Sequence, residues 1–225
     1  MGAGADLCSP MGLGRAVVAM LGAVIVTDVA NSAAAVKLLT VLASTGVGDV
    51  MAYDIDEAET AELLLGFASG LQRLTFLATA VVFIVWFHRV TRNAGAFAPD
   101  LPAHGPGWAI GGWFVPVAQL WIPRGIAAQV WQASRKDPYT GREHASSTLL
   151  NVWWGSCIAV LALSCFAEWR FDMAESPKEL FTATATLVLA DVLDTAAAVL
   201  AIRLVHKLTQ MQHAKALRGP EPVAV

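Results

Sequence analysis

The chain has 225 residues, of which 56% are hydrophobic and only 15% are charged, and its mean hydropathy is +0.56. Soluble domains are less apolar and carry about 25% charged residues, so this composition excludes an ordinary soluble domain. The net charge of −3 offers no basic surface for nucleic acid. We therefore expect a small protein that is built into a lipid bilayer.

The first long apolar segment covers residues 16–43 and follows a short N-terminal tail, residues 1–15. One positive charge, a short apolar core and small residues would also suit a cleaved secretory signal. However, the apolar character resumes after Asn31, and about 20 apolar residues are enough to cross a bilayer. We expect a first membrane span here, with a cleaved signal as the alternative.

Three further plain spans are predicted from their apolar composition, at residues 67–90, 149–168 and 180–205. An acidic stretch, residues 49–62, separates the first two spans, and its spacing suits a solvated loop and no EF-hand. We expect a single helical membrane domain at 16–209. A polar, proline-containing tail at 210–225 is expected to be disordered.

An apolar segment between the second and third plain spans, residues 108–131, differs from an ordinary span. Pro116 and Pro123 interrupt it, and each proline removes a helical hydrogen bond. It also contains four tryptophans, a residue type that gathers at the membrane–water interface. These are Trp108, Trp113, Trp121 and Trp131. We expect an all-α fold of four transmembrane helices plus a re-entrant or interfacial helical element, with a kinked fifth span as the alternative.

The distribution of Lys and Arg favours four spans over five, because these residues accumulate on cytoplasmic loops. If the Trp-rich element enters and leaves on one side, ten of them lie inside and four outside, whereas the best five-span arrangement gives nine and five. The ten are Arg15, Arg89, Arg92, Arg135, Lys136, Arg142, Arg203, Lys207, Lys215 and Arg218. We therefore expect the chain in the inner, cytoplasmic membrane, with both termini in the cytoplasm.

Ionisable side chains inside membrane spans are costly, so they are candidates for function. Asp28 and Asn31 share a face of the first span, and Asp191 and Asp194 share a face of the last span. Arg124 lies in the Trp-rich element. These five residues predict a polar cluster that passes ions or protons or binds a polar head group. The alternative is a structural network in which Arg124 pairs with Asp191 or Asp194.

The sequence gives little indication of other chemistry. His88 and His206 lie at the inner ends of spans, but two ligands without a third do not predict a metal site. The sequence contains no Gly-x-Ser-x-Gly or HExxH motif. We expect no cofactor, and an enzyme is the least favoured function.

Four motifs carry a resemblance to a known family: FIVWFHRVTRNAGAF at 83–97, PGWAIGGWFVPVAQLWIP at 106–123, QVWQAS at 129–134 and AIRLVHKLTQMQ at 201–212. Together they resemble the bacterial family called domain of unknown function 4328. The residues that carry the likeness are Trp86, Arg89, Asn93, Trp108, Trp113, Pro116, Pro123 and Trp131. The resemblance covers about residues 65–212 and implies a multi-pass bacterial membrane protein, but it implies no activity.

Two functions follow as hypotheses. The first is a non-enzymatic membrane module that binds lipid, a membrane protein partner or a second copy of the chain through the Trp-rich element. The second is a small transporter, or an ion or proton pathway, that uses Asp28, Asp191 and Asp194. The lipid bilayer is an expected partner in both cases, and nucleic acid is not.

Overall fold

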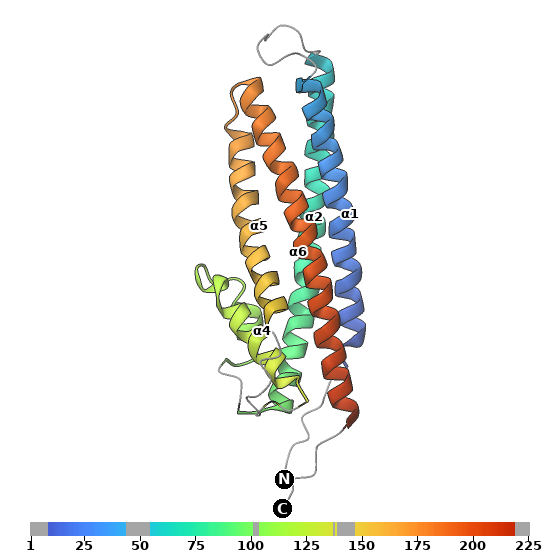
Figure 1. The fold of residues 1–225 in the computed structure, drawn as a ribbon, viewed down its shortest axis with the longest axis vertical. Helices are drawn as coiled ribbons and strands as arrows, with labels where there is room; N and C mark the ends of the chain where they lie inside the picture. Colours follow the sequence, from blue (N-terminus) through green and yellow to red (C-terminus); the bar gives the residue numbers. More distant parts are fainter. Residues whose placement is uncertain (1–8, 44–54, 101–103, 137, 139–146, 219–225) are drawn as a thin grey trace, which may run out of the picture. The chain divides into compact units, whose positions relative to one another are not determined.

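The computed structural model describes residues 9–43, 55–100, 104–136, 138 and 147–218, and every regular element in this part of the chain is helical. Four helices are long: α1 (Met11–Ala43), α2 (Ile55–Phe97), α5 (Thr148–Asp172) and α6 (Pro177–Arg218) (Figure 1). Three short helices lie between α2 and α5: α3 (Trp108–Gly111), the 3₁₀ helix η1 (Ala118–Leu120) and α4 (Ile122–Ala133).

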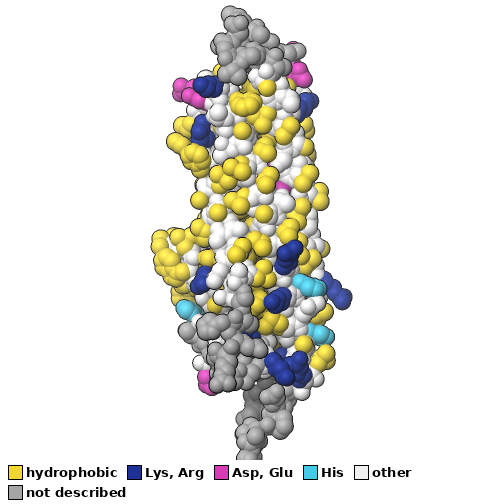
Figure 2. Space-filling view, in the orientation of Figure 1, with side chains coloured by type: hydrophobic (Ala, Val, Ile, Leu, Met, Phe, Trp, Pro, Cys, Tyr) yellow, Lys and Arg dark blue, Asp and Glu magenta, His cyan; other side chains and the backbone are white. Residues whose placement is uncertain are grey.

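The four long helices are long and apolar enough to cross a membrane. They contain 33, 43, 25 and 42 residues in chain order, whereas about 20 suffice to span the hydrocarbon core. In the most apolar 18 residues of each helix, one third or less is buried inside the protein. Hydrophobic side chains accordingly cover much of the visible surface (Figure 2). The chain is a multi-pass helical membrane protein, as its composition predicts.

All four long helices extend beyond the spans expected from the sequence, and α2 and α6 do so by more than ten residues at one end. α2 begins at Ile55, well before residue 67, because Asp56 and Glu57 in its first turn complement the positive end of the helix dipole. α6 continues to Arg218, so the prediction of a disordered tail is wrong for residues 210–218. Residues 49–54 of the acidic stretch lie outside the described part of the chain, as do the last residues, 219–225. The rest of the stretch, residues 55–62, begins α2 and is therefore helix, so the expected loop is wrong for this part.

The chain divides into two compact units, which we describe separately. The first unit comprises Met1–Ala19, Thr79–Trp154 and Leu200–Val225, and it contains the whole Trp-rich element. The second unit comprises Met20–Ala78 and Gly155–Val199, and it contains segments of all four long helices.

The core of the second unit is a seam between α1 and α2. Its buried residues are Ala34, Ala35, Leu38, Val41, Leu42, Ala58, Ala61, Leu65 and Ala68. They recur every three or four residues, which places them on one face of each helix. The alanines allow the two backbones to approach closely, as small residues do at other membrane helix interfaces. Phe171 of α5 and Leu187 of α6 pack against this seam.

The core of the first unit is aromatic. Trp113, which follows α3, packs edge-on against Phe83 and Phe87 of α2, with ring centroids 5.8 and 5.9 Å apart. It also packs against Trp154 of α5 at 6.0 Å. Edge-on pairs exploit the ring quadrupole and add to the gain from burial. The Trp154 Nε1 donates to the carbonyl of Leu120 at 3.0 Å, so the Trp-rich element is held to two long helices.

Candidate functional site

Polar side chains from three helices meet in the interior of the second unit. Asp28 and Asn31 of α1 are 1% and 3% exposed, and Asp191 of α6 is 6% exposed. The Oδ2 atom of Asp191 accepts hydrogen bonds from Asn31 Nδ2 and from Ser32 Oγ, both at 3.0 Å. Three polar side chains thus join α1 to α6 within segments long enough to cross a membrane.

Gln72 of α2 connects the two buried carboxyl groups. Its Nε2 donates to Asp28 Oδ1 at 2.8 Å and to Asp191 Oδ1 at 2.9 Å. One turn earlier on α2, the hydroxyl of Ser69 donates to Asn31 Oδ1 at 2.8 Å. The result is a network of hydrogen bonds that ties α1, α2 and α6 together, which we call the carboxylate network.

One further residue of α6, Thr195, completes the carboxylate network. Thr195 Oγ1 donates to Asp28 Oδ2 at 3.2 Å. Asp194 is half-buried and lies three residues after Asp191 on α6, but it takes part in none of the hydrogen bonds of the network. Between described residues of this unit, the only ion pair joins exposed atoms of Arg73 and Glu168 at 3.0 Å. The donors described above for Asp28 and Asp191 are all neutral amides and hydroxyls.

Four of the five residues predicted to form a polar cluster lie in this unit, and the fifth does not. Arg124 lies at the start of α4 in the first unit, where its exposed Nη2 donates to Asn151 Oδ1 of α5 at 2.8 Å. Its pairing with Asp191 or Asp194 stays a prediction. Sequence reasoning missed the part played by Gln72, although Ser69 and Gln72 are three residues apart and so share a helix face.

In the first unit, side chains of α6 bind the C-terminal end of α4. The Lys215 Nζ donates to the carbonyls of Ala133 and Arg135, both at 2.9 Å. The last carbonyls of a helix have no partner within the helix, and a lysine near them is favourable. This contact gives a physical reason why α6 stays helical beyond residue 210.

A second contact between α6 and its neighbours centres on Gln212, which is 1% exposed. Its Nε2 donates to the carbonyl of Val90 at 2.8 Å and to Ser134 Oγ at 3.2 Å. Its Oε1 accepts from Asn93 Nδ2 at 3.1 Å. One buried amide therefore links α2, α6 and the end of α4.

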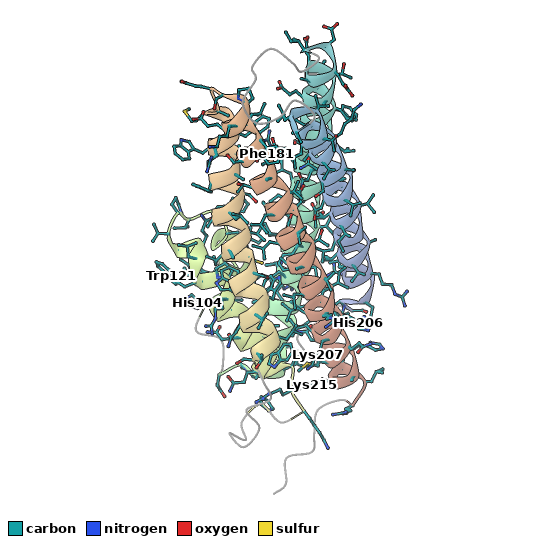
Figure 3. The ribbon with its side chains drawn as sticks, turned by 45° about the horizontal axis from the view of Figure 1, so that its top comes forward. His104, Trp121, Phe181, His206, Lys207 and Lys215 are labelled. Atoms are coloured by element: carbon teal, nitrogen blue, oxygen red, sulfur yellow. The ribbon has the colours of Figure 1, made fainter. Side chains whose placement is uncertain are left out.

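The middle of the Trp-rich element turns large apolar side chains outward. Phe114 is 71% exposed and Trp121 is 56% exposed, and Trp121 lies at the outer edge of this region in Figure 3. Between them, Val117 has a φ of 67° and a ψ of −51°, and Ala118 N donates to the carbonyl of Pro116 at 2.7 Å. This is the geometry of a γ-turn, which is strained for a β-branched residue.

The family model for DUF4328, a domain of unknown function, matches residues 50–210. The chain belongs to the DUF4328 family. The resemblance expected from the motifs is thereby confirmed. No curated protein and no solved structure matches the chain. The DUF4328 match includes Gln72, Asp191 and Asp194, whereas Asp28 and Asn31 precede it.

The residues that carry the DUF4328 likeness lie in the first unit, and most of them make internal contacts. Trp86 is fully buried, and its Nε1 donates to Thr209 Oγ1 at 3.2 Å. Arg89 Nη1 donates to the carbonyl of Ser9 at 3.4 Å. Pro123 is buried near the start of α4, a position where its missing N–H costs nothing.

The other DUF4328-like residues divide between interior and surface. Asn93 and Trp113 take part in the Gln212 contact and the aromatic core, as described above. Trp131 is 5% exposed and lies under the ammonium group of Lys207. Trp108 and Pro116 are exposed. The DUF4328-like residues therefore mainly secure the Trp-rich element to the long helices.

Proposed function

We propose that this protein is a non-enzymatic membrane module that binds lipid through its Trp-rich element. The observation that carries the proposal is the apolar outer face of that element. Its members are between 40% and 71% exposed: Phe114, Val115, Val117, Leu120 and Trp121. Contiguous apolar surface of this kind marks a membrane or protein interaction site. In a chain with four membrane-spanning helices, lipid is the nearest apolar medium.

The charges of the first unit support an interfacial position for the element on the cytoplasmic side. The described residues of this unit carry ten Lys or Arg and one acid, Asp100, whereas those of the second unit carry four Lys or Arg and eleven acids. Lys and Arg accumulate on the cytoplasmic side of membranes, where tryptophans also mark the interface. The proposal therefore places the element and both chain termini at the cytoplasmic face of the inner membrane.

Contact quenching tests the lipid-binding proposal. In a background in which Cys8, Cys157 and Cys165 are replaced by Ser, a fluorophore is attached at Phe114→Cys or Trp121→Cys in reconstituted protein. Lipids with brominated acyl chains quench only fluorophores that contact them. We expect strong quenching at both positions.

The matched control is Gln132→Cys, an exposed position near the other end of α4, where little quenching is expected. The proposal fails if positions 114 and 121 are quenched no more than position 132. If, in addition, chemical crosslinking from these positions captures a second copy of the chain, the apolar face is a protein interface instead.

As a second candidate we propose an ion or proton pathway, which the carboxylate network favours independently. Hydrogen-bonded carboxyl groups inside membrane spans are typical of proton relays. In liposomes, this candidate predicts a pH-dependent flux that is lost in the double variant Asp191→Asn with Asp194→Asn. Glu168→Gln, which changes an exposed acid of the same unit, should leave the flux intact. Absence of flux at every pH would exclude the pathway.

A further inference from the structure

A pocket of about 280 Å³ lies between the end of α4 and the last turns of α6. Among the residues that the structure describes, five cationic side chains and no acidic one line this pocket. The five are Arg135, Lys136, Lys207, Lys215 and Arg218. A concave surface lined by charges of one sign concentrates ligands of the opposite sign. This basic pocket is therefore suited to an anion.

Two of the five cations are held in place by neutral groups. The Lys207 Nζ lies 4.9 Å from the centroid of the Trp131 ring, a cation–π contact. The Lys215 Nζ is bound by the two carbonyls at the end of α4. The two lysines lie on the same helix, two turns apart (Figure 3). Because their positions are set before a ligand arrives, binding costs less conformational entropy.

Trp131 supplies an independent sign that the pocket takes a polar ligand. It lines the pocket, and only 5% of its surface is exposed. Its Nε1 is buried, and no residue in the described ranges accepts a hydrogen bond from it. A buried indole N–H normally has an acceptor. An anionic oxygen atom of a bound ligand would provide one.

We propose that the basic pocket binds a phosphate group, carried by an anionic lipid headgroup or present as a free anion. Basic pockets between membrane helices recognise phosphorylated lipid headgroups. Met211 and Ala214 add apolar surface to the pocket, which suits the glycerol and first acyl carbons of a lipid. If a lipid carries the phosphate, this inference rests on the proposed lipid-binding function and specifies the headgroup of the lipid that the protein binds.

The test uses the full-length protein in a detergent with no net charge. It is titrated calorimetrically with dihexanoyl phosphatidylglycerol, with the zwitterionic dihexanoyl phosphatidylcholine, and with sodium phosphate. We expect Lys207→Gln with Arg218→Gln to weaken phosphatidylglycerol binding about tenfold or more. Both side chains are exposed, so the helical content and melting temperature should match those of the wild-type protein.

The matched control is Arg15→Gln with Arg203→Gln, which removes the same charge from exposed positions that do not line the pocket. We expect this variant to bind like the wild type. Equal weakening in both double variants would show a diffuse charge effect and overturn the proposal. Wild-type affinity in the Lys207/Arg218 variant would also overturn it.

Competition between sodium phosphate and phosphatidylglycerol for the wild-type protein distinguishes a free anion from a lipid headgroup as the source of the phosphate. If sodium phosphate displaces phosphatidylglycerol and its own binding falls in the Lys207/Arg218 variant, the pocket takes the free anion. If only phosphatidylglycerol binds, and binds through these residues, the pocket takes the lipid headgroup. The fluorophores at positions 114 and 121 report acyl contact whatever the pocket binds, so the two proposals can fail independently.

Discussion

Gln72 is the residue on which the carboxylate network depends most. A single amide nitrogen donates to oxygens of Asp28 and Asp191 at 2.8 and 2.9 Å. A hydrogen bond between membrane helices is worth about 0.6 kcal/mol on average, but leaving a buried polar group without its hydrogen-bond partner costs about 1–3 kcal/mol. Because loss of one amide removes a donor from two buried carboxyl groups, the higher range applies here.

We predict that Gln72→Leu lowers the free energy of unfolding by about 2–3 kcal/mol. The measurement is reversible unfolding in mixed detergent, followed by circular dichroism. Gln210→Leu makes the same chemical change at an exposed position of α6, where a change within about 0.5 kcal/mol is expected. Equal losses of unfolding free energy in the two variants would show that the buried hydrogen bonds of Gln72 stabilise the protein no more than an exposed glutamine does.

At the scale of the element, the Trp-rich segment combines close packing with backbone strain. A Cβ atom on Gly112 would lie 2.8 Å from Ile122 Cγ2 and 2.8 Å from the carbonyl oxygen of Trp108. A Cβ on the adjacent Gly111 would meet nothing within 4 Å. Close approach of α3 to α4 therefore requires glycine at position 112 but not at position 111.

We predict that Gly112→Ala destabilises the protein by about 1–3 kcal/mol, the usual cost of overpacking. Gly111→Ala is the control, and we expect it to be neutral or slightly stabilising. Thermal unfolding followed by tryptophan fluorescence measures both, since Trp113 lies in the aromatic core. The packing argument is wrong if the two alanines have the same effect.

At the γ-turn we predict a gain of stability from a substitution of Val117, whereas Gly112→Ala should lose stability. A non-glycine residue held at such a backbone conformation costs about 1–3 kcal/mol, and Val117 is the only non-glycine residue with positive φ in the described part of the chain. Val117→Gly should therefore raise the melting temperature. Val115→Gly, which removes an exposed valine without relieving strain, should not raise it, and a similar change in both variants would count against a strained turn.

At the scale of the whole molecule, the proposed orientation depends on where the Trp-rich element begins and ends. Single cysteines at His104→Cys and Lys136→Cys, in the background without native cysteines, should resist a membrane-impermeant maleimide applied to intact cells. Asp56→Cys should react, because the acidic start of α2 is proposed to face outward. If only one of positions 104 and 136 reacts, the element crosses the membrane as a fifth span.

Features that depend on local chemistry could be predicted from the sequence alone. Four spans follow from runs of about 20 apolar residues, and the break in the Trp-rich element follows from Pro116 and Pro123. The face shared by Asp28 and Asn31 follows from helical spacing. Local chemistry was insufficient at the end of α6, where a polar composition indicated disorder but Lys215 and Gln212 bind neighbouring segments.

What only the tertiary structure decided is which side chains meet. Gln72 and Asp191 are 119 residues apart in the chain, and Gln212 and Val90 are 122 apart. Such pairs depend on the rotation and axial position of each helix, because an apolar stripe specifies a face but no partner. The sequence determined by itself that the chain is a helical membrane protein with one broken, Trp-rich element. The tertiary structure decided the carboxylate network and the basic pocket, because both are built from side chains on separate helices.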